Sequence, residues 1–343
     1  MPWMEEIRTI FDGLIIFLDE KRLTPGTEAR ARQVASRVHH HTAERWYDWD
    51  LGSIARACES DWVFIVERDE QLSPAWQEGH WRQTLESTDM THFWVPRRWV
   101  VPGGGYITVD PWWPDFQLRF VRNNVPGTVF PARLHDAICV PGAGGCFPNL
   151  PIYHHVLSLF SRAERDDRVR YYEHLRPGGG LGHYYLYENY APPEAPIPAE
   201  TKLDASETVQ SMGRLSKELI ARISVRVESV PRAVRVSDFF WLEAKVNNPT
   251  EVSLEYFAPH PVGMTYHWMK QATREMVVFE GHRSGLFPGL APNSAASYPM
   301  TVAAPNLAGE YILQTTMVQD GAYWFEDIQP DIVQEFLVSV LPR

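Results

Sequence analysis

A strand-like run that ends abruptly in acids is the clearest chemical signal in this chain. Residues 61–66 read Asp-Trp-Val-Phe-Ile-Val, and Glu67, Asp69 and Glu70 follow at once. A buried strand of this kind delivers its carboxylates to the edge of a sheet. Hard divalent cations prefer such oxygen ligands, and nucleoside diphosphates bind through such cations. The alternative is a strand followed by a solvated acidic turn, and this segment alone does not decide between the two.

A second polar cluster occupies residues 112–120, which read Trp-Trp-Pro-Asp-Phe-Gln-Leu-Arg-Phe. The indoles of Trp112 and Trp113 beside the carboxylate of Asp115 would form a platform for a sugar ring with a polar anchor. The structural alternative is an aromatic strand corner in which Asp115 caps a turn.

A third cluster is the pair His135 and Asp136. A lone histidine here would be read as part of a surface turn. Acids, an aspartate and a histidine follow one another within one segment of the chain, however, and this order favours a shared site.

The elements that must position these residues alternate between helix and strand. Such an alternation predicts an α/β sheet with parallel strands. The expected helices cover residues 4–11, 26–38, 50–60 and 156–175, and the expected strands cover 14–18, 38–41 and 62–66.

The C-terminal third has a different pattern. A Pro-rich linker over residues 191–201 and a helix over 207–220 are expected to precede strand-like alternation from residue 223 to the end. This pattern predicts an antiparallel β-sandwich of roughly 120 residues. Trp268 and Trp324 are expected in its core, and the alternative is a glycan-binding face that uses Tyr323 and Trp324.

Composition limits the class of protein. A length of 343 residues favours about two domains, and the net charge of −11 argues against broad attraction to nucleic acid or anionic membranes. The three cysteines have no CxxC spacing, which favours reduced thiols in the cytosol. No apolar run of about 18 residues occurs, so we expect a cytoplasmic protein with no transmembrane segment. The sequence leaves its oligomeric state open.

Taken in order, these segments resemble bacterial family 2 glycosyltransferases of the GT-A type. That family has a strand ending in Asp-x-Asp-Glu, then Trp-x-x-Asp-x-Gln-x-Arg, then His-Glu and a later His-containing segment. The matching segments here are residues 67–70, 112–122, 135–136 and 153–155, within a resemblance that covers roughly residues 5–185. Residues 11–19 resemble the family's second strand, its first strand has no counterpart, and Glu67 stands in the place of the first Asp.

The resemblance implies a role for each matching residue. Asp115 is implied as the general base, and Mn²⁺ or Mg²⁺ is implied as the cofactor that bridges the diphosphate. The implied metal ligands are Glu67, Asp69 and His135. The implied donor- and acceptor-binding residues are Asp19, Trp112, Trp113, Gln117 and Arg119.

The resemblance also implies a division of the chain. Residues 1–190 would form the Rossmann-like GT-A nucleotide-sugar domain, 191–222 a Pro-rich linker and helix, and 223–343 a separate all-β module. The last segment resembles the Ig-like sandwich that bacteria append to glycosyltransferases.

Three functional hypotheses follow from the sequence. The first is a metal-dependent glycosyltransferase that moves a sugar from a nucleotide-sugar donor to a glycan or glycolipid acceptor, in bacterial surface glycan biosynthesis. The second is a non-catalytic glycan-binding or assembly protein that retains a degenerate form of the same fold. A weaker third is a glycosidase that uses Glu67 and Asp115 as its two carboxylates.

Overall fold

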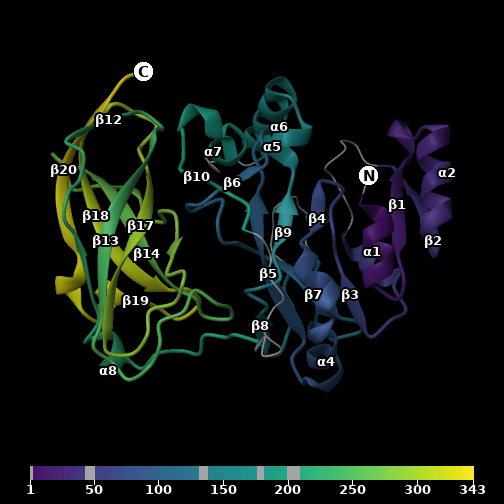
Figure 1. Cartoon of the computed structure of the whole chain (residues 1–343). Coiled ribbons are helices and arrows are strands. Elements are labelled where there is room, and N and C mark those ends of the chain that lie inside the picture. The colour runs from purple at the N-terminus through teal and green to yellow at the C-terminus, as the bar shows by residue number, and fades with distance from the viewer. Residues whose placement is uncertain (1–2, 43–50, 131–137, 176–180, 199–208) are drawn as a thin grey trace. The chain divides into compact units, whose positions relative to one another are not determined.

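The fold is described from a computed structural model of the chain (Figure 1). It describes residues 3–42, 51–130, 138–175, 181–198 and 209–343, and the elements counted below lie within these ranges. The chain forms two compact units. The first contains the residues up to Pro96, Gln117–Tyr153 and Val209, and the second contains Arg97–Phe116, His154–Pro198 and Gln210–Arg343.

The first unit alternates short helices and strands along its N-terminal half. Its helices are α1 (Met4–Ile10), η1 (Glu20–Arg22), α2 (Pro25–Val34), α3 (Leu51–Arg56), η2 (Pro74–Glu78) and α4 (His80–Ser87). Its strands are β1 (Ile15–Asp19), β2 (Arg37–His41), β3 (Trp62–Phe64), β4 (Glu70–Leu72) and β8 (Gly144–Cys146). Three further strands continue along the chain into the second unit, namely β5 (His92–Trp99), β7 (Asp115–Arg122) and β9 (Ile152–His154).

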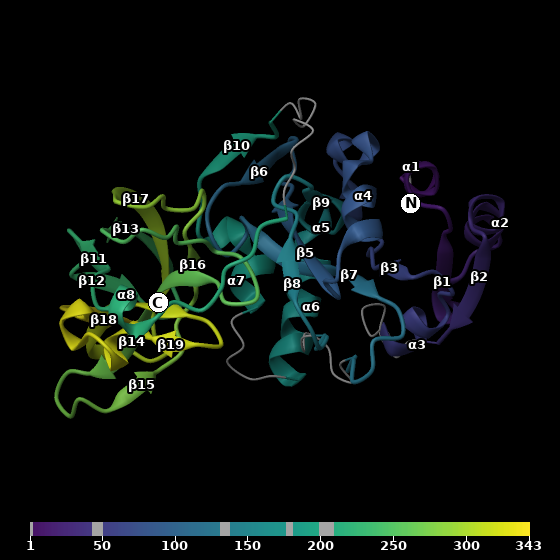
Figure 2. The ribbon, with the colours of Figure 1, turned by 90° about the horizontal axis from the view of Figure 1, so that it is seen from below.

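Strands β1 and β2 form a parallel pair that is joined by helix α2, which lies beside them in both views (Figures 1 and 2). Helix α2 begins cleanly because Thr24 accepts a hydrogen bond from the Thr27 N–H at 3.2 Å and Pro25 occupies the first turn. The β-α-β prediction is therefore confirmed for this segment.

The larger sheet is mixed, which corrects the expectation of parallel strands throughout. Its order is β3-β7-β5-β9-β4, with β8 paired to β5. Strand β3 pairs antiparallel with β7, whereas β8 runs parallel to β5. The pairing of β3 with β7 matters for the site because it joins the strand that ends in acids to the strand that carries Arg119.

Aromatic rings fill the core of the first unit. Phe64 lies 4.7 Å from Phe120 and 4.9 Å from Trp76, measured between ring centroids. The indole N–H of Trp76 donates to the Pro151 carbonyl at 3.0 Å, so this large ring is buried without an unpaired donor. The aromatic content of the chain thus serves packing here, and it fixes the end of β3.

The second unit is mostly β-structure. Its helices are α5 (Val156–Leu159), α6 (Arg162–Leu175), α7 (Leu181–Tyr185), η3 (Tyr187–Asn189), α8 (Lys217–Ile220), η4 (Phe325–Asp327) and η5 (Pro330–Ile332). Its shorter strands are β6 (Gly105–Ile107), β10 (Glu194–Pro196), β11 (Ser224–Val227), β12 (Ala233–Arg235), β15 (Met276–Val278), β16 (Ser284–Gly285) and β19 (Tyr323–Trp324). Its longer strands are β13 (Phe239–Asn248), β14 (Val262–Lys270), β17 (Ser294–Ala303), β18 (Gly309–Gln319) and β20 (Gln334–Leu341).

Two sheets dominate residues 224–341. A three-stranded sheet has the order β11-β13-β17, and a seven-stranded sheet follows the path β12-β20-β18-β14-β15, with β16 paired to β14 and β19 paired to β18. The pairings are antiparallel except for β12 with β20. Trp268 on β14 is fully buried, and its indole N–H donates to the Ala303 carbonyl on β17 at 2.8 Å, so the two sheets share one core. The core position predicted for Trp268 is confirmed, whereas Trp324 is only half-buried.

The helices predicted over 26–38 and 50–60 are shorter than expected, as α2 and α3, and two others differ more. The helix expected over 156–175 is interrupted, because the Ser161 hydroxyl accepts from the Glu164 N–H and the Glu164 carboxylate accepts from the Ser161 N–H at 2.8 Å. This capping box starts a new helix at Arg162. The helix expected over 207–220 is reduced to α8, which Ser216 caps, and residues 207 and 208 lie outside the described part.

The structure is therefore a mixed α/β chain with mostly sheets and few helices. In the described ranges, no helix has the length and apolar character needed to cross a membrane. The division at residues 190 and 223 stays a prediction.

Candidate functional site

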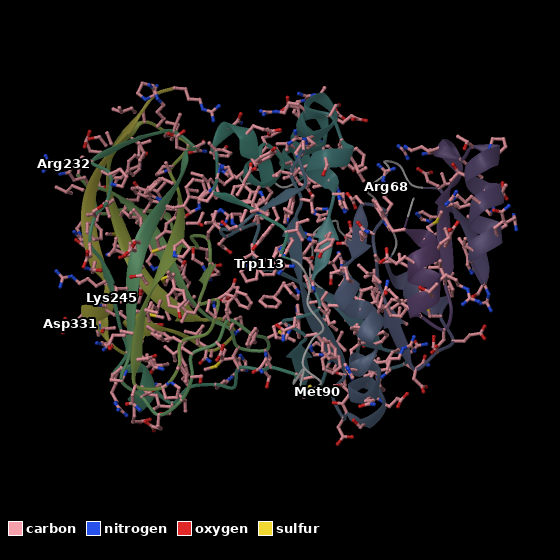
Figure 3. The ribbon with its side chains drawn as sticks, in the orientation of Figure 1. Arg68, Met90, Trp113, Arg232, Lys245 and Asp331 are labelled. Carbon is pink, nitrogen blue, oxygen red and sulfur yellow. The ribbon has the colours of Figure 1, made fainter. Side chains whose placement is uncertain are left out.

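The acids after β3 form a turn that is held by Arg119. Glu70 is fully buried and Asp69 is 3% exposed. The Arg119 guanidinium donates to the Glu67 carboxylate at 3.0 Å and also to the Glu70 carboxylate. The second oxygen of Glu70 accepts from the Glu67 N–H at 3.0 Å, which closes the turn on itself. Arg68, in the middle of this turn, is labelled in Figure 3.

Strand pairing explains why Arg119 is available to these acids. The Ile65 N–H donates to the Arg119 carbonyl at 2.9 Å, immediately beyond the paired residues of β3 and β7. Gln117 lies two residues before Arg119 on β7, so the two share one face of the strand. Strand pairing therefore brings Arg119 to the acids, where it fixes the turn. The predicted role of Arg119 in binding donor or acceptor stays a prediction.

A metal site made by the protein alone is not formed in the described ranges. There, no group of three or more His, Cys, Asp or Glu side chains is arranged to hold an ion. Glu67 already accepts from Arg119, and His135 lies outside the described residues. Mg²⁺ is commonly held by one or two carboxylates together with substrate phosphates. Asp69 lies in the turn between β3 and β4 and is 3% exposed, and its role as a metal ligand stays a prediction.

Asp19 ends β1 and has a local structural role. Its carboxylate accepts from the Lys21 N–H at 3.1 Å and forms an ion pair with Arg22, and so it caps the short helix η1. Its predicted contact with a nucleotide stays a prediction.

Asp115 begins β7 and is held in an ion pair. One carboxylate oxygen, Oδ2, accepts from Arg97 at 2.8 and 2.7 Å and from the indole N–H of Trp99 at 2.7 Å. Both charged side chains are only 12–13% exposed. Proton transfer to Oδ2 would compete with these donors, so the base role predicted for Asp115 has to be tested through its pairing with Arg97.

The two tryptophans that precede Asp115 do not form a shared platform. Trp112 is fully buried and its N–H donates to the Tyr184 carbonyl at 3.0 Å, so its ring belongs to the core. Trp113 is half-buried, and the Arg98 guanidinium lies 4.5 Å from its ring centroid. The predicted sugar platform is therefore corrected, because one ring packs inside the unit and the other is stacked against arginine.

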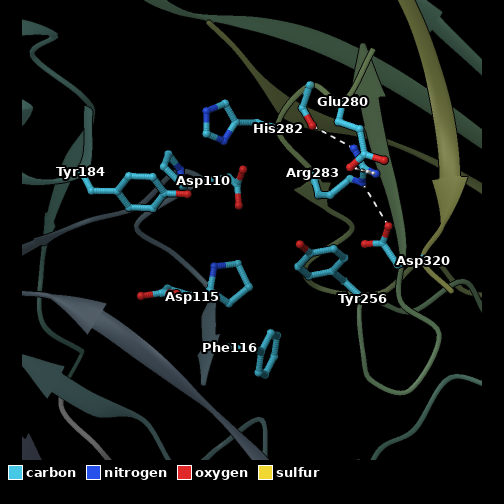
Figure 4. Close-up of a pocket in the computed structure, with 12 residues that line it drawn as sticks. Asp110, Asp115, Phe116, Tyr184, Tyr256, Glu280, His282, Arg283 and Asp320 are labelled. Carbon is cyan, nitrogen blue, oxygen red and sulfur yellow. Dashed lines mark hydrogen bonds and ion pairs between the residues drawn. The ribbon is translucent and has the colours of Figure 1, made fainter. Parts of the chain in front are cut away.

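A cavity of about 500 Å³ lies beside Asp115 within the second unit (Figure 4). Five separate stretches of the chain line it: residues 110–116, Tyr184 of α7, and three loop segments at Tyr256, residues 280–283 and Asp320. The lining residues are Asp110, Pro111, Pro114, Asp115, Phe116, Tyr184, Tyr256, Glu280, Gly281, His282, Arg283 and Asp320.

Burial sets the protonation of the cavity. It raises the pKa of Asp110 well above its usual value, and the negative charge of Asp115 adds to this shift. Burial lowers the pKa of His282 to about 4, and the adjacent positive charge of Arg283 contributes. Burial also raises the pKa of Tyr184 and of Tyr256. Burial therefore favours the neutral forms of the Asp110 carboxyl, the two phenols and the His282 imidazole.

Sequence reasoning missed Asp110, Tyr184, Tyr256 and His282 as site residues. Asp110 precedes the Trp-Trp-Pro-Asp segment by only two residues, and this proximity was the one available signal. The other three come from distant positions, and no spacing rule connects them.

Comparison with known proteins does not assign this chain to a family. No protein-family model matches the chain, and no curated protein matches it. A β-glucosidase from Listeria innocua is similar over 36% of this chain and 16% of its own, with 9% identity and a TM-score of 0.24. An alkylpurine DNA glycosylase from Pseudomonas fluorescens is similar over 35% of this chain and 31% of its own, with 7% identity and a TM-score of 0.24. A family 123 glycoside hydrolase from Clostridium perfringens covers 32% of this chain and 22% of its own, with 9% identity and a TM-score of 0.21. Likeness at this level assigns neither family nor function.

Proposed function

We propose that this chain is a family 2 glycosyltransferase with a GT-A-like domain and an Ig-like β-sandwich module. It would transfer a sugar from a nucleotide-sugar donor to a hydroxyl of a glycan or glycolipid acceptor, in bacterial surface glycan biosynthesis. The observation that carries the proposal is the buried acidic turn at the end of β3, fixed by Arg119 of the neighbouring strand β7. The turn follows β3 and leads directly into β4, whose first residue is Glu70.

The charges of the turn define what it would bind. Three carboxylates, of Glu67, Asp69 and Glu70, stand against two guanidinium groups, of Arg68 and Arg119. The turn carries a net negative formal charge, and it would repel a diphosphate unless a cation lay between them. A bound Mn²⁺ or Mg²⁺ would offset the charge that develops on the leaving diphosphate. Within the chain, Arg119 and Glu70 hold the backbone of the turn, and Asp69 is the carboxylate that we propose to contact the cation.

The experiment is calorimetry of the full chain with UDP and GDP, with and without Mn²⁺, followed by turnover of the corresponding nucleotide sugars. We expect heat only when the cation is present, and loss of that heat in Asp69→Asn. Asp12→Asn is the matched control, because Asp12 is an exposed carboxylate that pairs with Arg82 outside the turn. Absence of both nucleotide binding and turnover in the wild-type chain would rule out the glycosyltransferase.

A second candidate, a non-catalytic glycan-binding protein, is favoured by one feature. The carboxylate that would act as base, Asp115, is already engaged by Arg97 and Trp99. This candidate predicts glycan binding without any sugar-nucleotide turnover, whereas the enzyme predicts that Asp115→Asn abolishes turnover and leaves nucleotide binding intact.

A further inference from the structure

We propose that the cavity lined by Asp110, Tyr184, Tyr256 and His282 is a binding site for a neutral saccharide. The site is built by the second unit, and it goes beyond the proposed function because it needs neither a nucleotide nor transfer. Its walls include the loop of residues 280–283 from the β-sheet region. The sandwich module would thus take part in carbohydrate recognition.

Asp110 is the central polar group of the cavity. Its Oδ2 atom is buried and has no hydrogen-bond partner among the described residues. The carboxyl points toward the space between Tyr184 and His282 (Figure 4). Its backbone is fixed, because the Thr301 hydroxyl on β17 donates to the Asp110 carbonyl at 2.6 Å. A buried polar atom without a partner costs free energy, and a ligand hydroxyl would remove that cost.

Three more polar groups approach the same space. The phenol oxygens of Tyr184 and Tyr256 and the ring of His282 are directed at it (Figure 4). Phenols and a neutral imidazole can donate and accept, and so can the protonated form of the Asp110 carboxyl, which burial favours. A sugar hydroxyl does both, so this mixture matches a polyhydroxylated ring.

The charged groups at the cavity exclude an anionic ligand such as a phosphate. Asp115 is paired with Arg97, and Asp320 accepts from Arg283 at 3.0 Å. Glu280 lies 3.4 Å from the same guanidinium, so the cavity has no surplus positive charge. Because the Arg283 guanidinium is already offset by Asp320 and Glu280, a cationic ligand is tested directly with glucosamine.

The aromatic wall and the volume of the cavity also suit a saccharide. Phe116 lies 6.4 Å from Tyr256 and 5.7 Å from Phe257 between ring centroids, so one wall of the cavity is aromatic. The ring of Tyr256 packs directly against the backbone of Gly285, since a Cβ at this position would lie 2.4 Å from the ring. A volume of about 500 Å³ is within the range of ordinary ligand sites and suits a mono- or disaccharide.

The experiment is saturation-transfer NMR with titration, using the full chain and three neutral disaccharides: cellobiose, maltose and N,N′-diacetylchitobiose. Glucose 6-phosphate and glucosamine are the charged comparators. We expect at least one neutral disaccharide to bind, and to bind more tightly than both comparators. Tyr184→Phe and Tyr256→Phe each keep the ring and remove one hydroxyl, and each should weaken binding about 3- to 10-fold.

Asp110 is tested with two variants. Asp110→Asn retains one donor and one acceptor and should bind within about 3-fold of wild type, whereas Asp110→Ala should lose about 10-fold or more. Tyr323→Phe is the control, because Tyr323 does not line the cavity and belongs to the alternative glycan-binding face. Circular dichroism on every variant establishes that the fold is kept.

Four outcomes would overturn the proposal. They are no binding of any of the three disaccharides, equal binding by wild type and by Tyr184→Phe, Tyr256→Phe and Asp110→Ala, tighter binding of either charged comparator, and a loss confined to Tyr323→Phe. Repeating the titration in Asp69→Asn separates the two proposals, since saccharide binding there should persist even if nucleotide binding fails.

Discussion

Removal of the Arg119 guanidinium is the sharpest test of the acidic turn. Arg119→Met keeps an unbranched apolar side chain but removes the guanidinium that pairs with the Glu70 carboxylate, whose side chain is 0% exposed. Breaking a buried ion pair by removing one partner costs about 3–5 kcal/mol. The pair of Arg119 with Glu67 contributes much less, because the Glu67 side chain is 44% exposed and water replaces the interaction. For that partner about 0–1 kcal/mol is expected.

The assay is denaturant unfolding followed by tryptophan fluorescence, with Trp76 and Trp81 in the core of the same unit as reporters. Arg119→Met should lower the free energy of unfolding by about 3–5 kcal/mol, whereas Glu67→Gln should change it by less than about 1 kcal/mol. Replacing both partners, in Arg119→Met with Glu70→Leu, should recover much of the loss, since an apolar pair of similar volume is often neutral. The reasoning fails if Arg119→Met is no worse than Glu67→Gln, or if the double variant is no better than the single one.

Three further predictions concern the second unit. Gln319 is fully buried and bonds three backbone groups at 2.8–3.0 Å, so Gln319→Leu should destabilise the unit by about 3 kcal/mol or more, seen as a lower thermal midpoint; an unchanged midpoint would contradict this. Burial acts to raise the pKa of Glu326, but the hydrogen bond from His267 at 2.9 Å helps to hold it below 4.5, so the stability that Glu326 contributes is present above pH 4.5 and is lost as the pH falls below it. Glu326→Gln should flatten that acid limb of the stability profile, and an unaltered limb would refute the assignment. The pKa of Asp110, in contrast, is raised in the folded chain. In the unfolded chain the Asp110 carboxyl therefore loses its proton at lower pH, and the stability of the fold falls as the pH rises above 3.8. Asp110→Asn should therefore stabilise the chain more at pH 7 than at pH 4, measured by thermal melts at both values. The groups that face Asp110 are Asp115, Tyr184, Tyr256, His282 and Arg283. Equal stabilisation at the two pH values would contradict the prediction.

The local pattern of apolar and polar residues predicted helices and strands well where the burial of one face decides the structure. The parallel pair of β1 and β2 and the strand before Glu67 follow from apolar runs bounded by turn residues. The break at Ser161 was also readable, since Ser-x-x-Glu is a capping box, but the longer apolar and charged periodicity hid it.

The site was harder to predict, because the pairing of strands that are distant in sequence decides which side chains meet there. The acids at the end of β3 were located by sequence, yet their chemistry depends on Arg119 from an antiparallel neighbour some fifty residues later. Asp115 was identified by residue type, and its engagement by Arg97 and Trp99 became visible only in three dimensions. The cavity beside it combines stretches of chain that no short motif spans.

The close packing of the Tyr256 ring against Gly285 restricts which residues at position 285 are compatible with this cavity. The backbone of Gly285 has an ordinary dihedral angle, so the restriction is steric and any side chain at this position competes with the aromatic ring for the same space. Alanine is the smallest such competitor. Variation at position 285 would therefore alter the shape of the cavity while the strand itself still forms, and ligand selectivity could diverge at a residue that never touches the ligand.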